Sequence, residues 1–553
     1  MTEMNITVGQ FLFDCLNKEG ITEIFGVPGD YNFSLLDILE HYQQINFVNC
    51  CNELNAGYAA DGYARVKGIG ALITTFGVGE LSACNAVGGA YSESVPVIHI
   101  VGAPKSMVIK ARKKMHHTLL DGDFDVFRRI YENITSYTAF VTAENAAIEI
   151  PAAIQKAREL SKPVYLVIPI DVAPIKLLKR DYAFEQKKTN PSSLEEALKI
   201  IHPMIANAQH PVIISDLYVI RYGLERQVEQ LAEKLNIPAV TMMMGKSSFD
   251  ESRGNFIGFY YGQLGSNMVR EIVESSDCVL TVGAVWNDYN TGYFTAKLNP
   301  LHVIEIKPGC VKVGKAVFEH IFMEDVLNEL LKLSKRKNTP MPAIIFPFDN
   351  LPAPTTVPLT AAYYYPRFQQ MLQENDVLIA EAGTLSNGLA QIRLKKGVTY
   401  ITQGGWGCIG YATPAAFGAA VAAPNRRVLV FTGDGALQLT VQELSSLLGN
   451  GCKPIIFVLN NNGYTIEKYI NTPQQTAYNS IPMWDYTKLP EIFGQSAFVR
   501  RVSTEKELDE AIMLAEEQCR LQLCLIEMIV PPMDAPEIVH KTKQLLEEMQ
   551  KRG

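Results

Sequence analysis

The sequence predicts an α/β fold with three doubly wound domains, each built on a parallel sheet. Strand-like apolar runs alternate with helix-like segments along the 553 residues, a pattern typical of parallel sheets covered by helices. Two polar stretches, Leu177 to Ser193 and the proline-rich Lys335 to Val357, have the composition of linkers. We therefore expect domains at residues 1–180, 193–338 and 358–553, each of ordinary domain size.

Composition and charge argue against several classes of function. Hydrophobic residues make up 47% and charged residues 20% of the chain, as in ordinary globular proteins. A net charge of −8 argues against nucleic acid as the main partner. We see no apolar run long enough to span a membrane and no apolar signal segment at the N-terminus. The ten cysteines contain no Cys-x-x-Cys pair, so we expect reduced thiols and a cytoplasmic location.

In the first third, polar residues follow apolar strands and begin helices. Ile24 to Val27 leads into Gly29-Asp30-Tyr31-Asn32, which on its own predicts a turn and a helix N-cap. Glu53 starts a segment of small residues, where a surface carboxylate that complements the helix dipole is the default interpretation. His116 and His117 are adjacent in a loop. No zinc-like ligand spacing accompanies them, so proton transfer is the alternative to metal binding.

The middle third predicts another parallel sheet without a phosphate-binding fingerprint. Pro211 to Asp216 and Cys278 to Gly283 have the continuous apolar pattern of buried parallel strands. We find no G-x-G-x-x-G sequence after a strand, so a dinucleotide site has little support.

The last third holds a strand–helix–strand unit with the strongest functional signal. The strand Arg427 to Phe431 runs into Gly433-Asp434-Gly435, and the strand Pro454 to Leu459 runs into Asn461-Asn462-Gly463. Parallel sheets bind ligands at the carboxyl ends of such strands. Asp434 offers a carboxylate oxygen, Asn461 an amide oxygen, and the glycines offer open N–H groups. Either turn alone would be ordinary, but together they predict a phosphate site bridged by Mg²⁺.

These two turns resemble the thiamine-diphosphate motif, Gly-Asp-Gly followed by Asn-Asn. The continuation Gly463-Tyr464-Thr465-Ile466-Glu467 resembles that of the 2-keto acid decarboxylases. The resemblance implies pyrimidine-binding, central and diphosphate-binding domains in that order, with thiamine diphosphate and Mg²⁺ as cofactors. It also implies a homodimer at least, usually a homotetramer, that acts on a small 2-keto acid and has no nucleic-acid or membrane partner. The implied reaction is non-oxidative decarboxylation to an aldehyde and CO₂, through a ylid and an enamine of the cofactor.

The resemblance assigns catalytic roles to five side chains. Glu53 corresponds to the carboxyl that activates the cofactor by hydrogen bonding to its aminopyrimidine ring. Asp30, His116, His117 and Glu467 correspond to the groups that surround the reacting carbon and assist protonation and aldehyde release. The histidine pair is what separates this branch from acetohydroxyacid synthases and other relatives.

The same correspondence implies how the cofactor is held. Asp434, Asn461 and the Gly463 carbonyl are the implied Mg²⁺ ligands. The Gly407 carbonyl would accept from the pyrimidine amino group, and Ile409 would be a stiff β-branched wedge beneath the cofactor. The other implied cofactor-binding residues are Glu53, Thr384, Gly435, Ala436, Tyr464, Thr465 and Ile466. Many relatives carry a hydroxyl where Ala436 stands, so one side-chain contact to phosphate is missing.

Residues that set the pocket width in relatives are small here. Pyruvate-specific relatives have an aromatic residue where Asn387 stands, so we expect a preference for branched-chain, longer linear or aromatic 2-keto acids. Each extra methylene is worth only ~1–3 kcal/mol in an apolar pocket, which favours broad specificity. The implied pocket residues are Tyr289, Ala382, Ser386, Asn387, Ile466, Ile470, Thr542 and Leu546.

Three other functions are weighed against this interpretation. Pyruvate decarboxylase proper is the alternative for the substrate. A thiamine-dependent carboligase (acyloin synthase) would use the same cofactor, but the histidine pair and Glu467 argue against that as the main role. A non-catalytic binding protein would not need intact Glu53, Asp434 and Asn461. We expect no cysteine-based substrate activation, because the loop Leu217 to Ile220 lacks the cysteine of activated relatives.

Overall fold

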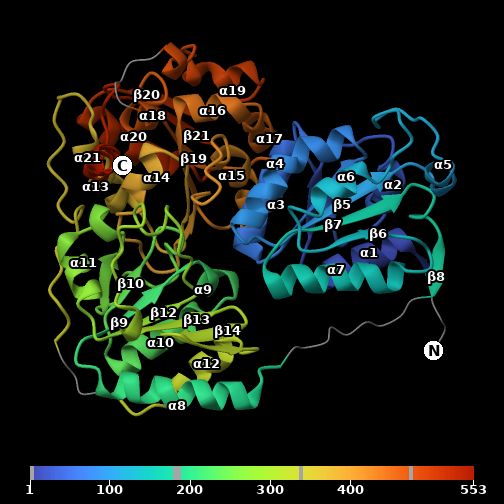
Figure 1. Cartoon of the computed structure of the whole chain (residues 1–553). Coiled ribbons are helices and arrows are strands. Elements are labelled where there is room, and N and C mark those ends of the chain that lie inside the picture. The colour runs from blue at the N-terminus through green and yellow to red at the C-terminus, as the bar shows by residue number, and fades with distance from the viewer. Residues whose placement is uncertain (1–4, 179–187, 336–339, 472–476, 553) are drawn as a thin grey trace.

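The computed structural model describes residues 5–178, 188–335, 340–471 and 477–552 (Figure 1). The predicted domain limits at residues 1, 180, 338 and 553 lie outside the described residues, as do parts of both predicted linkers. Three α/β units are visible, each built around one sheet. The predicted fold class is therefore confirmed.

The first unit has a six-stranded sheet in which every paired strand is parallel, in the order β3-β2-β4-β5-β7-β6. Strands β4, β5 and β7 are buried along their whole length, as their continuous apolar sequences require. The strands are β2 (Glu23–Gly26), β3 (Asn46–Asn49), β4 (Gly70–Thr75), β5 (Val97–Ala103), β6 (Thr138–Phe140) and β7 (Val164–Pro169), and β1 (Asn5–Thr7) pairs separately with β8 (Lys176–Leu178). The helices are α1 (Val8–Lys18), α2 (Phe33–Glu40), α3 (Glu53–Lys67), α4 (Val78–Ser92), α5 (Ser106–Lys110), α6 (Val126–Tyr131) and α7 (Ala146–Leu160).

The last unit repeats this topology with a parallel sheet in the order β17-β16-β18-β19-β21-β20. Numbered from its own first strand, each of the two sheets runs 2-1-3-4-6-5. The strands are β16 (Val377–Ala380), β17 (Thr399–Ile401), β18 (Val428–Gly433), β19 (Ile455–Asn460), β20 (Phe498–Val502) and β21 (Cys524–Ile529). The helices are α13 (Ala361–Met371), α14 (Thr384–Leu389), α15 (Ala412–Ala422), α16 (Asp434–Thr440), α17 (Glu443–Gly449), α18 (Thr465–Ile470), α19 (Leu489–Ile492), α20 (Glu505–Gln518) and α21 (Glu537–Arg552), with short 3-10 turns η3 (Ala477–Asn479) and η4 (Tyr486–Lys488).

The central unit has parallel strands in the order β11-β10-β9-β12-β13, extended by the antiparallel strands β14 and β15. The two predicted strands are present as β9 and β12. The strands are β9 (Pro211–Ser215), β10 (Ala239–Thr241), β11 (Phe256–Phe259), β12 (Cys278–Val282), β13 (Val303–Lys307), β14 (Cys310–Val313) and β15 (Ala316–Glu319). The helices are α8 (Pro191–Asn207), α9 (Leu217–Arg221), α10 (Glu225–Leu235), α11 (Asn267–Glu274) and α12 (Met323–Leu330), with η1 (Gly262–Leu264) and η2 (Pro300–His302).

Helices α3 and α15 join the first unit to the last (Figure 1). Their backbones approach so closely that a Cβ on Gly62 would lie 2.2 Å from the Ala415 carbonyl oxygen. A Cβ on Gly418 would lie 1.8 Å from the Ala59 carbonyl oxygen. The small residues of both helices therefore permit this contact. No helix of the described residues is both long and apolar enough to cross a membrane.

Candidate active site

The two predicted turns of the last unit meet at the carboxyl ends of β18 and β19. Asp434 is the first residue of α16. Asp434 and Asn461 are both buried, with 2% and 5% of their surface exposed. The Gly435 N–H donates to Asp434 Oδ1 (2.7 Å), and the Gly463 N–H donates to Oδ2 (3.1 Å). The Asp434 carboxylate thus accepts hydrogen bonds from both turns.

A cavity of about 320 Å³ lies beside this carboxylate. It gathers residues from three strand ends and from the loop before α15, which lie far apart in the sequence. The implied site residues that line it are Ala382, Thr384, Ile409, Asp434, Gly435, Ala436, Asn461, Gly463, Tyr464, Thr465, Ile466 and Glu467. Gly463 is needed for the backbone path, because its φ is +117° and a Cβ would lie 2.4 Å from the Asn479 carbonyl oxygen.

The chemistry of this cavity fits a divalent cation bound to a phosphate. Asp434 and Asn461 present hard oxygen ligands from buried positions, which Mg²⁺ prefers. A Cβ on Gly433 would meet nothing within 4 Å, so space remains open at the strand end. Burial raises the pKa of Asp434, and the backbone N–H donors oppose that rise. A bound cation would favour the ionised carboxylate in the same way as the N–H donors.

The loop before α15 is held by a residue of the first unit that sequence reasoning missed. Glu93 Oε1 accepts from the N–H groups of Gly405 (2.6 Å) and Trp406 (3.1 Å). Gly407 follows with a φ of +70°, is exposed and does not line the cavity, whereas Ile409 does. The role of Glu93 depends on a contact across more than 300 residues, and no local pattern around it signals that contact.

In the first unit, Asp30 and the histidine pair form one cluster. His116 Nε2 lies 2.6 Å from Asp30 Oδ2, and His117 Nδ1 lies 3.6 Å from Asp30 Oδ1. The Tyr31 ring stacks on His116 with centroids 5.1 Å apart, and its hydroxyl donates to the His116 carbonyl (3.3 Å). The cluster is partly open, with 58% of the His116 side chain exposed. A carboxylate beside two imidazoles is an arrangement that can transfer protons.

Glu53 is the first residue of α3 and is half-buried. The Asn52 side chain caps this helix by accepting from the Asn55 N–H (2.8 Å). Gly79 leaves room for the carboxylate, since a Cβ there would lie 3.1 Å from Glu53 Oε1. Asn55 Nδ2 donates to Glu443 Oε2 (2.8 Å), which places the start of α3 beside α17. Glu53 does not line the cavity at Asp434, and neither do Asp30, His116 or His117.

Of the implied substrate residues, Ala382 and Ile466 line this cavity. Tyr289 Oη lies 3.5 Å from Ser386 Oγ, and Asn387 Nδ2 donates to the Gly383 carbonyl (2.8 Å). Tyr289 and Ile466 pack against the same apolar cluster, which includes two buried residues of α21. On α21, Thr542 is buried and its hydroxyl donates a hydrogen bond to the Ile538 carbonyl, while Leu546 is half-buried. On α18, the Ile470 side chain is 39% exposed.

Two further residues near the site were given no role from the sequence. Glu381 is 1% exposed and accepts from the N–H groups of Ala412 (3.2 Å) and Ala382 (3.3 Å). Burial raises the pKa of Glu381 to about 7. Burial raises the pKa of Tyr293, and the nearby charges of Asp288 and Glu467 raise it further. A buried acidic residue directly after strand β16 was the available signal for Glu381.

Family models of thiamine pyrophosphate (thiamine diphosphate) enzymes match all three units. The N-terminal TPP binding domain matches residues 6–124, the central domain matches residues 198–332 and the C-terminal TPP binding domain matches residues 381–526. The two cofactor-binding models fall on the units that carry Glu53 and Asp434 respectively.

Full-length relatives are decarboxylases. The chain is 38% identical over 560 residues to pyruvate decarboxylase isozyme 3 of Saccharomyces cerevisiae, covering 98% of both chains. It is 39% identical to pyruvate decarboxylase of Kluyveromyces marxianus, again covering 98% of both. It is 40% identical to alpha-keto-acid decarboxylase of Mycobacterium leprae, over 96% of this chain and 94% of that protein. The chain therefore belongs to the thiamine-diphosphate-dependent 2-keto acid decarboxylases.

Proposed function

We propose that this decarboxylase acts best on 2-keto acids larger than pyruvate, with branched-chain, longer linear and aromatic acids as candidates. The observation that carries the proposal is the small size of the residues at the implied pocket positions Ala382, Ser386 and Asn387. The Asn387 amide is bonded to the Gly383 carbonyl of its own helix, so the position contributes no ring to the pocket. Apolar pockets distinguish added methylenes by only ~1–3 kcal/mol, which favours a broad substrate range.

The surroundings of Ile466 support an apolar substrate tail. Ile466 lines the cavity at Asp434 and packs with Tyr289 against a cluster that includes Tyr261, Ile538 and Val539. Such a wall can exclude water from a branched or aromatic side chain.

The proposed roles of the site residues follow from their chemistry. Thiamine diphosphate, when bound, supplies the electron sink that makes loss of CO₂ possible. Asp434, Asn461 and the Gly463 carbonyl would hold Mg²⁺, and the open N–H groups of this edge would hold the diphosphate. Glu53 would hydrogen-bond to the aminopyrimidine ring. The remaining proposed contacts to the cofactor are Thr384, Gly407, Ile409, Gly435, Ala436, Tyr464, Thr465 and Ile466.

The Asp30 cluster is proposed to handle protons at the reacting carbon. Asp30 Oδ2 lies against His116 Nε2, so the carboxylate can orient the imidazole and stabilise its protonated form. His117 and Glu467 are the further groups proposed to share this task. Protonation of the reacting carbon and release of the aldehyde complete the cycle.

We propose that a complete site needs two chains, in a homodimer or a homotetramer. Within one chain, neither Glu53 nor the Asp30 cluster lines the cavity that holds Asp434. A second copy could bring its first unit to that cavity. We also propose a cytoplasmic location, which fits a chain whose cysteines form no disulfide bonds with one another.

Initial rates on a panel of 2-keto acids test the substrate proposal. The panel comprises pyruvate, 2-ketoisovalerate, 2-ketoisocaproate, longer linear acids, phenylpyruvate and indolepyruvate, each with and without thiamine diphosphate and Mg²⁺. We expect the larger acids to give higher kcat/KM than pyruvate, and the activity to require both cofactors. A kcat/KM that is highest for pyruvate would make the chain a pyruvate decarboxylase and overturn the proposed preference.

A further inference from the structure

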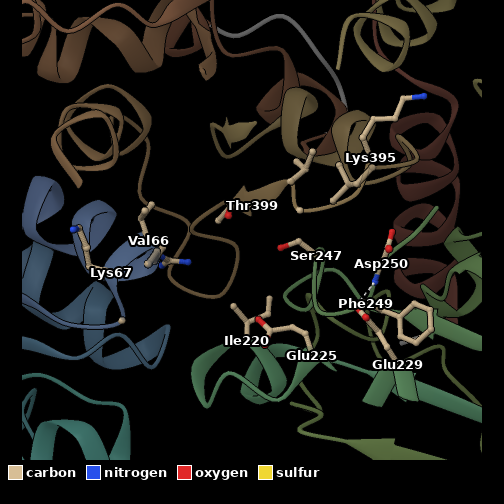
Figure 2. A pocket seen from close by; sticks show the side chains of 15 residues that line it. Val66, Lys67, Ile220, Glu225, Glu229, Ser247, Phe249, Asp250, Lys395 and Thr399 are labelled. Carbon is tan, nitrogen blue, oxygen red and sulfur yellow. Dashed lines mark hydrogen bonds between the residues drawn. The ribbon is translucent and has the colours of Figure 1, made fainter. Parts of the chain in front are cut away.

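A second cavity, of about 470 Å³, lies where all three units meet (Figure 2). The end of α3, helices α9 and α10, the loop at 247–250 and the loop at 394–399 form its walls. It shares no lining residue with the cavity at Asp434. Its volume is within the range of small-molecule sites.

The cavity has an apolar wall to which every unit contributes. Phe249 and Leu394 are almost fully buried, at 2% and 3% exposure, and belong to the central and last units. The five apolar side chains of the wall are Val66, Ile220, Phe249, Leu394 and Val398. A ligand with an apolar side chain could fill this space and would touch all three units at once.

Charge is separated across the cavity by unit. Its carboxylates, Glu225, Glu229 and Asp250, all come from the central unit, whereas Lys67 and Lys395 come from the first and last units. In Figure 2, Glu225 and Ser247 face the central space, while Lys67 and Lys395 extend away from it. The lysine side chains are long and flexible enough to turn inward towards an anion.

Among the described residues, Glu225 is the carboxylate of this wall that forms no ion pair with a side chain. Glu229 accepts from Arg253 (3.0 Å) and from the Asp250 N–H (3.2 Å). Glu225 is half-buried, and its ionised carboxylate is favoured by its own backbone N–H and by the nearby charge of Arg221. Burial raises the pKa of Glu225 to about 7, because its ionised form is poorly solvated. A cationic group inside the cavity would relieve that unfavourable desolvation.

We propose that this cavity binds a free α-amino acid with an apolar side chain as a regulatory ligand. The ammonium group pairs with Glu225, the carboxylate is met by the cations of the opposite walls, and the side chain lies on the apolar wall. A zwitterion matches a cavity whose two signs of charge come from different units.

The cavity is connected to the cofactor side through β17. Thr399 lines the cavity and begins β17, and Thr402 follows that strand. Arg65, which also lines the cavity, donates from Nη1 to the Thr402 carbonyl (3.1 Å). The next residues form the loop that reaches Ile409 in the other cavity. A ligand that draws the three walls together therefore biases this loop, and the coupling must be reciprocal with cofactor or substrate binding.

Calorimetric titration of the full chain, loaded with thiamine diphosphate and Mg²⁺, tests binding without relying on activity. L-leucine and L-phenylalanine are the probes. Matched analogues are 4-methylpentanoate, which lacks the ammonium group, and isoamylamine, which lacks the carboxylate. We expect at least one of the two amino acids to bind at up to millimolar concentration, and both analogues of leucine to bind more weakly than leucine. No binding of either amino acid, or equal binding of leucine and 4-methylpentanoate, would overturn the proposal.

Two variants on α10 show whether Glu225 recognises the ligand. Glu225→Gln should weaken amino-acid binding by about tenfold or more, because a charge-assisted hydrogen bond is lost. Glu233→Gln is the matched control, since its side chain is 73% exposed and outside the cavity. Equal affinity in the two variants would refute the role of Glu225. The thermal midpoint of each variant verifies that it folds. The effect of leucine on the KM for the 2-keto acid measures the coupling between the two cavities. Only this last measurement rests on the proposed function.

Discussion

At the scale of single residues, His99 is a buried histidine outside the site with a clear effect on stability. Its side chain is fully buried between Tyr131 and Tyr165, and Nε2 lies 2.9 Å from Thr74 Oγ1. Burial lowers the pKa of His99 to about 3, from an ordinary value of 6.5. The unfolded chain therefore binds a proton here between pH 6.5 and 3 that the folded chain does not bind, so acid favours unfolding over this range.

We predict that His99→Gln makes the thermal midpoint less sensitive to acid. Between pH 6.5 and 4 the wild type should lose stability faster than the variant, by up to ~1.4 kcal/mol per pH unit from this group. Buried acids such as Glu381 act in the opposite direction, since a raised folded-state pKa gives stability that is lost as pH rises from about 4.5 to about 7. These acids are present in both the wild type and the variant, so the difference between their pH dependences reports on His99 alone. Scanning calorimetry measures the thermal midpoint of each protein against pH. Parallel curves for the wild type and the variant would contradict the predicted effect of His99.

The structure brings predicted site residues together where two strands of one sheet supply them, and their roles stay predictions. Asp434 and Asn461 follow neighbouring strands of a strand–helix–strand unit, so local patterns alone bring them together. Glu93 was missed because it acts on a loop from another unit. The cavity at Glu225 was missed for the same reason, since its walls come from segments that only the packing of three units brings into contact.

At the scale of elements, the contact between α3 and α15 depends on glycine. Gly62→Ala would place its Cβ 2.2 Å from the Ala415 carbonyl oxygen, a backbone atom that cannot rotate away. We predict a loss of ~1–3 kcal/mol, the usual cost of overpacking, with the helices forced apart. Gly449→Ala is the matched control, because that helical glycine has nothing within 4 Å of the added Cβ. Thermal unfolding would measure the effect, and equal midpoints for the two variants would refute it.

The elements themselves were predictable to different degrees. Continuous apolar runs identified buried parallel strands such as β9, β12 and β18. The antiparallel pair β14 and β15 was not predicted, because its strands are short and only partly buried. Its glycine turns, with φ of +82° at Gly309 and +57° at Gly314, were the available hairpin signal.

At the scale of the whole molecule, one chain carries the two halves of the proposed site on different units. The first unit holds Glu53 and the Asp30 cluster, and the last unit holds the cavity at Asp434. The shared strand order of these units places both sets of residues at the carboxyl ends of strands. Two such chains related by a twofold axis could each complete the other's site. The axis repeats the same contact twice, so the first unit of each chain meets the last unit of the other.

Mixing two inactive variants tests this arrangement. Glu53→Gln and Asp434→Asn should each be inactive alone, because every site then lacks cofactor activation or a metal ligand. In a mixed dimer, one site combines intact Glu53 from one chain with intact Asp434 from the other. Random pairing makes about half of the dimers mixed, so co-refolded equimolar chains should recover about a quarter of wild-type activity. If mass spectrometry shows mixed dimers and activity stays absent, Glu53 and Asp434 of the same chain share one site.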